Sequence, residues 1–413
     1  MPSRRRVLQT LLHGALIGAT PAFAAQRVRH IAPDGVGDGA DWARAAPFER
    51  LDDMVRAVGP GGVVNLRADP GDVYRLGARG VALRSGGAPS APVIVRGLRS
   101  DGAAGFATLE GDRTPWERPS DAERVTDVRG WTPGAPLIRL HSGAGGLVFE
   151  RLDVRRAGAA IQCMASCAHL VIRDCRGFNV RRWFEMTRGV SANHVVIERL
   201  GVVGFSKQAI RCRGDSHDWR IRDVRLDSAR QDGDDFAVGI QFDDTAHDVL
   251  VQGAELSNCH DSLRAYHNGD GGSSELGNYG IEWRDVRSYG HTDAGLDNKG
   301  ACVYRNVECW DNKVGLRFWT RPQEAHGVVV RDSRLRGGSG RPALIGVYGA
   351  PGPHVTINDL TARESGAGTA FLLAGADARV DVHGHRIDLS DGATMTHVAA
   401  EGRGARLRLD PPI

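Results

Sequence analysis

Residues 291–319 read HTDAGLDNKG ACVYRNVECW DNKVGLRFW and contain the pattern that decides the fold. Two segments of the same type, AGLDN at 294–298 and VGLRF at 314–318, enclose an apolar run around residues 303–306. Alternate side chains of a β-strand face the same way. If both segments are strands, Asp297 and Lys299 share one face, and Arg317 and Trp319 share the equivalent face one repeat later. The stretch therefore predicts two stacked repeats with polar side chains on an outer surface.

The same two components recur along the chain from about residue 137. The first is an apolar run that ends in a charged dipeptide, as in LVFER (147–151), LVIRD (170–174), VVIER (195–199), WRIRD (219–223), IEWRD (281–285) and VVVRD (328–332). The second is a short strand beside a small residue, as in AAIQC (159–163), RWFEM (182–186), QAIRC (208–212), VGIQF (238–242) and DSLRA (261–265). Units recur roughly every 20 to 30 residues, a period typical of solenoids.

A repeat of this length, made of short strands, predicts an all-β solenoid whose coils stack about 4.8 Å apart. The helical periodicity of ankyrin or tetratricopeptide arrays is absent, and so is the Leu/Asn pattern of leucine-rich repeats. A solenoid needs covered ends, and the helical apolar spacing of residues 48–58 predicts an N-terminal cap. We expect residues 25–136 to hold the cap and the first coils with a loop insertion, and residues 137–413 to form the solenoid domain.

Composition and the N-terminus indicate an exported protein. Lys and Arg number 53 against 50 Asp and Glu, and the net charge of +3 with scattered arginines argues against a nucleic-acid partner. Residues 1–24 combine a basic start, an apolar stretch and the AFA sequence at 22–24, which predict a signal peptide. SRRRVL at 3–8 resembles a twin-arginine signal, so we expect a periplasmic or extracellular protein. A membrane anchor is the alternative, but the apolar run is too short to span a bilayer, and no later stretch is suited to it.

Stacking the short strands in register produces two outward columns of side chains. The first is Gln162, Glu185, Arg211, Gln241, Arg264, Asp297 and Arg317, and the second is Met164, Thr187, Arg213, Asp243, Tyr266, Lys299 and Trp319. Arginine recognises carboxylates, and tryptophan and tyrosine offer flat faces to sugar rings. The columns therefore predict a surface for an acidic polysaccharide. The alternative is an ordinary ladder of ion pairs, which leaves the two outward aromatic side chains unexplained.

The coil pattern, the cap and this motif resemble the right-handed parallel β-helix polysaccharide lyases, over residues 28 to 389 or so. DAGLD at 293–297 looks like the DDGxD calcium motif of family 9 pectate lyases, with Ala294 in place of one aspartate. Lys299 and Arg317 on the next coil look like the Lys/Arg pair of the chondroitinase B and alginate lyase family, although Phe318 and Trp319 stand where that family has His-Gly. The resemblance implies a single-stranded right-handed parallel β-helix.

The chemistry implied by the resemblance is β-elimination at a uronic acid. Calcium or arginine neutralises the substrate carboxylate, and a lysine whose pKa is lowered by neighbouring positive charge removes the C5 proton. Tyr266 or His267 is the expected proton donor to the leaving oxygen. The candidates are Lys299, Arg317 and Tyr266 for catalysis, Arg211, Arg213, Arg264, His267 and Trp319 for substrate binding, and Asp243, Asp270, Asp293 and Asp297 for calcium.

Three other functions remain open at this point. A glycoside hydrolase on the same fold needs two carboxylates, for which Asp243, Asp244 and Asp297 are candidates, but the NTD, DD and GHG signatures of polygalacturonases are not found together. A C5 epimerase shares the step of proton abstraction. A non-catalytic glycan-binding protein is the third alternative. In each case we expect a monomer.

Overall fold

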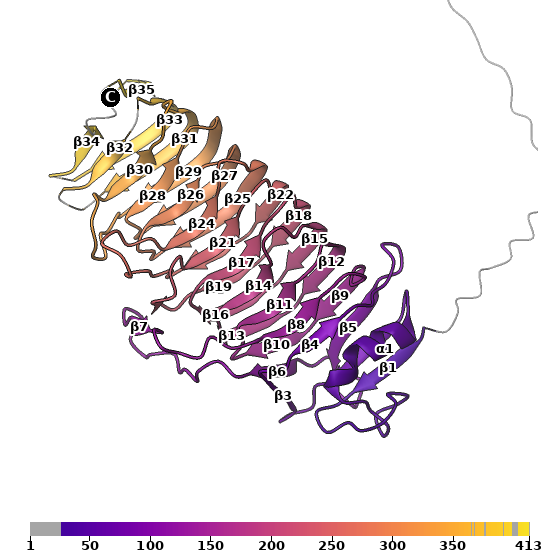
Figure 1. Ribbon diagram of the computed structural model, residues 1–413. Coiled ribbons are helices and arrows are strands. Elements are labelled where there is room, and N and C mark those ends of the chain that lie inside the picture. The colour runs from indigo at the N-terminus through magenta and orange to yellow at the C-terminus, as the bar shows by residue number, and fades with distance from the viewer. Residues whose placement is uncertain are drawn as a thin grey trace, which may run out of the picture.

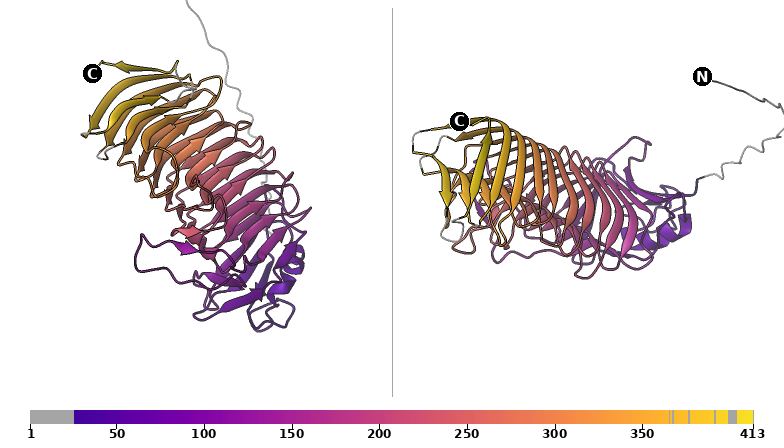
Figure 2. Two further views of the ribbon diagram at one scale, coloured as in Figure 1. Left: turned by 60° about the vertical axis from the view of Figure 1, so that its left-hand side comes forward. Right: turned by 90° about the horizontal axis from the view of Figure 1, so that it is seen from above.

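The protein is a solenoid of stacked parallel β-strands (Figure 1). The computed structural model describes residues 26–364 and, beyond them, 366, 368–375, 377–390, 392–398 and 404–412. The predicted signal peptide, residues 1–24, lies outside the described residues. The views in Figure 2 show successive coils displaced along one axis, so the expectation of a parallel β-helix is confirmed.

One side of the solenoid is a twelve-stranded parallel sheet to which each coil contributes one short strand. These strands are β4 (Val81–Leu83), β8 (Pro136–Leu140), β11 (Ala159–Cys163), β14 (Arg182–Met186), β17 (Gln208–Cys212), β21 (Val238–Phe242), β24 (Asp270–Ser274), β26 (Ala294–Asn298), β28 (Val314–Phe318), β30 (Ala343–Val347), β32 (Ala370–Ala374) and β34 (Thr394–Val398). Apolar side chains at alternate positions point inward and stack coil on coil, as Ile161, Phe184, Ile210 and Ile240 do.

The rest of each coil forms two parallel ladders that merge in one long strand. The first ladder holds β1 (Val28–Ile31), β2 (Val63–Arg67), β5 (Val93–Leu98), β9 (Leu147–Glu150), β12 (Cys167–Arg173), β15 (Ala192–Glu198), β18 (His217–Arg222) and β22 (His247–Gln252). The second holds β3 (Val73–Gly77), β6 (Ala107–Gly111), β10 (Leu152–Arg155), β13 (Arg176–Val180), β16 (Gly201–Phe205), β19 (Arg225–Asp227) and β23 (Glu255–Ser257). Both pair with β25 (Tyr279–Tyr289), which β27 (Cys302–Trp310), β29 (Gln323–Arg331), β31 (His354–Glu364), β33 (Arg379–Leu389) and β35 (Arg406–Asp410) follow.

The charged dipeptides of the sequence repeat mark a sharp corner between the two ladders. Their second residues adopt a left-handed backbone with φ between 51° and 54°, at Arg151, Asp174, Arg199, Asp223 and Asp285. Aspartate tolerates this conformation better than most residues. Arg199 is held there by an ion pair with Asp174 of the coil before, at 2.6 Å. The repeat in the sequence therefore reports where each coil bends.

The N-terminal end is covered by a short helix, as expected. A 3-10 turn η1 (Phe48–Arg50) leads into α1 (Leu51–Val58), whose residues Leu51, Met54, Val55 and Val58 are buried against β1, β2, β4 and β5 (Figure 1). A separate two-stranded pairing joins β7 (Thr126–Asp127), in the loop that projects from the first coils, to β20 (Gln231–Asp232). Among the described residues, no helix is long and apolar enough to cross a membrane.

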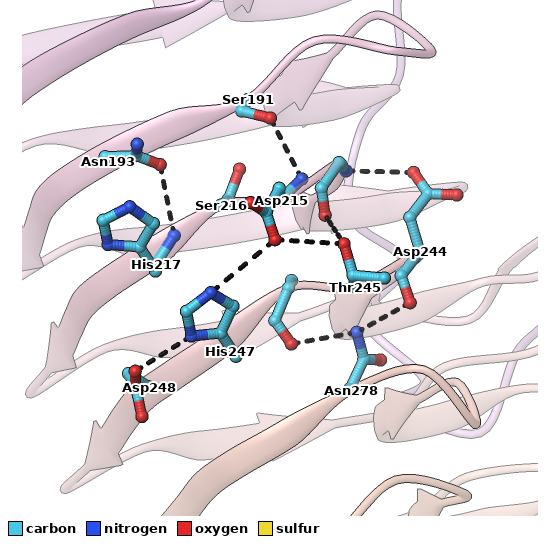
Figure 3. Close-up of polar contacts among 12 residues, drawn as sticks. Ser191, Asn193, Asp215, Ser216, His217, Asp244, Thr245, His247, Asp248 and Asn278 are labelled. Atoms are coloured by element: carbon cyan, nitrogen blue, oxygen red, sulfur yellow. Dashed lines mark hydrogen bonds and ion pairs between the residues drawn. The ribbon is translucent and has the colours of Figure 1, made fainter.

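Side chains in the turns that follow the twelve-stranded sheet tie each coil to the next. The amide of Asn278 donates to the carbonyl oxygen of Asp244 at 3.4 Å (Figure 3). It also donates to the carbonyl oxygen of Ala246 at 3.0 Å. His247 contacts Asp248 through Nδ1 at 2.9 Å, and its ring stacks on His217 with centroids 5.2 Å apart. Because these polar groups pair with one another within the turns, the turns stabilise the stacking of the coils.

One coil does not use the strand that the sequence pattern predicts. DSLRA at 261–265 lies in a loop with Leu263 exposed, and the strand of that coil is β24, with sequence DGGSS. Its Gly272 stands in register between Ile240 and Leu296. A Cβ atom on Gly272 would lie 2.4 Å from the ring of Trp283, which fills the inward space instead. This coil therefore places a different set of side chains on the outer face.

Candidate active site

The candidate site lies on the outer face of the twelve-stranded sheet, where β24, β26 and β28 adjoin. In register, Ser273, Asp297 and Arg317 follow one another in the first outward column, and Glu275, Lys299 and Trp319 follow in the second. Arg264 and Tyr266 were predicted to hold the places that Ser273 and Glu275 occupy. That part of the prediction is wrong, because the strand of this coil is β24.

Arg317 is the centre of a buried hydrogen-bond network. Its guanidinium donates to both oxygens of Asp293, to Asp297 Oδ2 at 3.1 Å and to the Tyr266 hydroxyl at 2.8 Å. The Tyr266 hydroxyl in turn donates to Asp293 Oδ1 at 2.8 Å. The pKa of Arg317 is raised far above its usual value, since Asp293 and Asp297 outweigh the burial that would lower it. Arg317 is therefore a fixed positive charge.

Asp293 is a fully buried carboxylate held between two cations. Besides Arg317, it contacts the ammonium of Lys313, with Nζ 3.1 Å from Oδ1 and 1% of the Lys313 side chain exposed. Burial alone would raise the pKa of Asp293, but Arg317, Lys313 and the Tyr266 hydroxyl lower it by more. The pKa of Lys313 is lowered, chiefly by burial, although Asp293 opposes the shift. The ionised pair is stabilised as a unit in the wall of the site.

Asp270 begins β24 and is a third buried carboxyl group beside Asp293 and Asp297. Its Oδ1 accepts the backbone N–H of Ala294 at 2.8 Å. Burial, followed by the charges of Asp293 and Asp297, raises the pKa of Asp270 well above its usual value. The pKa of Asp270 is thus shifted in the opposite direction from that of Asp293.

Lys299 and Trp319 form the more accessible edge of the site. Lys299 Nζ contacts both oxygens of Glu275 at 3.0 Å and lies 5.8 Å from the ring centroid of Trp319. Trp319 donates from Nε1 to Asp297 Oδ1 at 2.6 Å, and its ring packs against that of Tyr348 with centroids 5.3 Å apart. The expected lowering of the Lys299 pKa is wrong. Burial does lower it, but Glu275 raises it by more, so Lys299 stays protonated.

Arg211, Arg213 and Asp243 form a second polar group on the same face. Arg211 Nε contacts Asp243 Oδ2 at 2.7 Å, Arg213 Nε lies 3.5 Å from the same oxygen, and Gln241 donates to Asp243 Oδ1 at 2.7 Å. β17, which carries Arg211, lies three strand spacings from β26, or about 14 Å. Asp243 follows β21, two strands from β26, and is engaged by the two arginines, which lie on the same outward face as Lys299.

Two of the predicted substrate-binding side chains point elsewhere. Arg264 is 67% exposed and pairs with Asp235 at 3.1 Å, so it does not flank Lys299 as expected. The ring of His267 contacts the Arg336 carbonyl through Nδ1 at 3.0 Å, while its own carbonyl accepts from Lys313 at 3.2 Å. His267 thus fastens the loop before β24 to the loop after β29.

Lys313, Glu275 and Tyr348 belong to the site but were not predicted. Aligning AGLDN with VGLRF places Lys313 beside Asp293, one residue before each strand, so the sequence did carry a signal for this pair. Glu275 carried none, because the glycines of β24 conceal the strand. Tyr348 follows β30 in the column of Trp319, and its signal was the irregular strand around residues 343–347.

The residues do not fit a bound calcium ion. Calcium takes six to eight oxygen ligands, but Asp293 and Asp297 are engaged by Arg317, Asp243 is engaged by Arg211, and Asp270 accepts the backbone N–H of Ala294. Within the part of the chain that the structure describes, no group of three or more His, Cys, Asp or Glu side chains is arranged to hold a metal ion.

Comparison with solved structures identifies the fold. The pectate lyase Pel9A is 12% identical with a TM-score of 0.54, covering 84% of this chain and 79% of that one. The A-module of the Azotobacter vinelandii mannuronan C-5 epimerase AlgE4 is 12% identical with a TM-score of 0.57, covering 87% and 94%. The A-module of AlgE6 from the same organism is 12% identical with a TM-score of 0.52, covering 93% and 98%. The chain is a right-handed parallel β-helix.

Comparison of the amino-acid sequence with known proteins found no relative. No protein-family model matches the chain, and no curated protein matches it. At 12% identity the structural likeness shows the fold alone, so the function has to be argued from the site.

Proposed function

We propose that the protein is an exported enzyme that cleaves a uronate-containing polysaccharide by β-elimination on the outer face of the twelve-stranded sheet. The observation that carries this proposal is the half-buried Trp319–Tyr348 pair beside the Lys299 ammonium. An aromatic face binds a sugar ring. A lysine beside that face can bind the carboxylate of a uronate or remove the proton next to it. Arg211 and Arg213 extend the same face and suit a chain of acidic sugars.

The reaction needs two proton transfers, one to Lys299 and one from Tyr266. Lys299, once it has lost its proton, takes the C5 proton of the uronate. The electron pair left at C5 forms the C4=C5 double bond, and the C4–O bond breaks. Tyr266 carries its phenolic proton at neutral pH, as tyrosine ordinarily does, and burial raises its pKa further. It supplies the proton to the leaving oxygen. Arg317 stabilises the negative charge that develops beside it.

Hydrolysis is a second candidate, favoured by the aspartates. Burial raises the pKa of Asp270, whereas Arg317 and Lys313 lower that of Asp293. Carboxyl groups whose environments push their pKa values apart are typical of acid and base pairs in glycosidases. Both reactions would cleave the same class of glycan, but they yield different products.

The test is to incubate purified protein with polygalacturonate, alginate and glycosaminoglycans and to follow two products. Ultraviolet absorbance from the unsaturated uronate supports the lyase, whereas new reducing ends without absorbance refute it in favour of hydrolysis. Proton exchange at C5 without chain cleavage indicates an epimerase, and binding without any reaction indicates a glycan-binding protein. Lys299→Ala should abolish activity, whereas Lys207→Ala, a partly buried lysine paired with Asp234 on another coil, should not.

A further inference from the structure

The segment 293–297, which resembles a calcium motif, is paired with a cation of the chain itself. Lys313 Nζ lies 3.1 Å from Asp293 Oδ1, 3.2 Å from the carbonyl oxygen of His267 and 3.4 Å from the ring centroid of Tyr266. A carboxylate and a backbone carbonyl are the oxygen ligands that calcium takes in proteins. The three contacts match the three N–H groups of an ammonium ion.

The remaining capacity of Asp293 is used by neighbours within the chain. Oδ2 accepts from Arg317 Nη1 at 2.9 Å, and Oδ1 accepts from Tyr266, Arg317 and Lys313. The side chains of Asp293 and Lys313 are 0% and 1% exposed. A buried carboxylate requires a paired cation, and removing one partner leaves an uncompensated charge.

We infer that the Lys313 ammonium replaces the calcium ion of this motif, so that the site works without a metal and Lys313 acts as a positioning residue. Lys313 pairs with Asp293 together with Arg317, and Asp293 orients Arg317 and the Tyr266 hydroxyl toward the outer face. The catalytic part of this inference rests on the proposed function. The replacement of the metal does not, because it concerns only contacts within the protein.

Lys313 also contacts one of two loops that meet at His267. The His267 carbonyl comes from the loop before β24, and the His267 ring is held by Arg336 from the loop after β29. Through His267, the Lys313 ammonium is thus connected to the loop before β24 and the loop after β29, which are far apart in the sequence. Of the three lysines in the chain, two therefore belong to the site, and Lys207 provides the matched control.

The first experiment uses the wild-type protein. After dialysis against a chelator, elemental analysis should find no calcium, and added CaCl2 should leave the melting temperature and any lyase activity unchanged. Stoichiometric calcium, a rise in melting temperature with CaCl2, or activity that requires it would overturn the inference while leaving the lyase proposal intact.

The second experiment removes the ammonium and then returns it. Lys313→Ala should lower kcat by at least about tenfold with KM within about twofold, because the buried side chain does not touch substrate. Ethylammonium should restore part of the activity and raise the melting temperature of Lys313→Ala, but not of Lys207→Ala. Wild-type kcat and melting temperature in Lys313→Ala would refute the role.

Two further readouts keep the result decisive. If Lys313→Ala does not fold, Lys313→Met retains the volume of the stem without the charge, and its kcat and melting temperature are compared in the same way. If no polysaccharide reacts, the proposed function fails, but calcium content and rescue of the melting temperature by ethylammonium still decide whether Lys313 replaces the metal.

Discussion

The protonation of Lys299 sets the pH dependence of the proposed reaction. Its pKa lies above the ordinary value of 10.5 because of Glu275. At pH 7 at most about 3 in 10,000 molecules then carry the neutral amine. Because only the neutral amine accepts a proton, kcat/KM should rise about tenfold per pH unit from neutral pH until the pKa of Lys299 is reached.

Glu275→Gln tests this reasoning directly. The Lys299 and Glu275 side chains are 30% and 42% exposed, so solvent screens the pair, and its strength is about 0.2–1 kcal/mol. Removing the charge lowers the pKa of Lys299 by that free energy, which increases the neutral fraction and kcat/KM at pH 8 roughly 1.4- to 5-fold. Above the pKa the variant and the wild type should react equally fast.

The assay is the initial rate of absorbance increase with the best uronate polymer, measured from neutral to strongly alkaline pH. Glu282→Gln serves as the control, because Glu282 pairs with Arg284 on the other side of the coil. Two results would refute Lys299 as the base. One is a rate that does not depend on pH, and the other is a rise of kcat/KM with pH that is the same in Glu275→Gln as in the wild type. If Glu275→Gln lowers KM without changing the pH dependence of the rate, Lys299 binds the substrate carboxylate instead.

Three further outcomes follow from the structure. Arg317→Met removes the main partner of the buried Asp293, leaving Lys313 as its remaining cation, and should destabilise the protein by about 3–5 kcal/mol, measured by chemical denaturation; equal stability would show that the pair is not buried in solution. Trp319→Ala should raise KM about 2- to 12-fold, the equivalent of 0.5–1.5 kcal/mol, with a smaller change in kcat. Gly272→Ala should cost about 1–3 kcal/mol through overpacking, whereas Gly201→Ala, with no atom within 4 Å of the added Cβ, should be nearly neutral.

The sequence predicted the solenoid because its signals are local. The alternation in AGLDN and VGLRF fixed which residues point outward, and the alignment of the two segments correctly placed Asp297 beside Arg317. The charged dipeptides recur because each coil bends at the same place with a left-handed residue. These features need only neighbouring residues and a constant period.

The parts that the sequence did not predict depend on contacts between distant segments. β24 contains two consecutive glycines and lacks β-branched residues, so it does not look like a strand. Its inward space is filled by Trp283, which lies on β25. The burial of Lys313 likewise depends on the His267 carbonyl, 46 residues away. No local pattern indicates either arrangement, and the error at β24 moved Arg264 into the predicted site.

The construction of the site explains why it is sensitive to register. Asp293, Lys313 and Arg317 come from two consecutive coils, and Tyr266 comes from the loop before a third. Insertions in the connecting loops leave the strand pairing unchanged, so the loops can vary while the charges stay together. A slip of one residue in β28 would instead turn Arg317 into the apolar interior and leave Asp293 buried without its main partner, which is unfavourable by several kcal/mol. The buried pair therefore selects one register for the strands that carry it, and the same register places Lys299 and Trp319 side by side on the outer face.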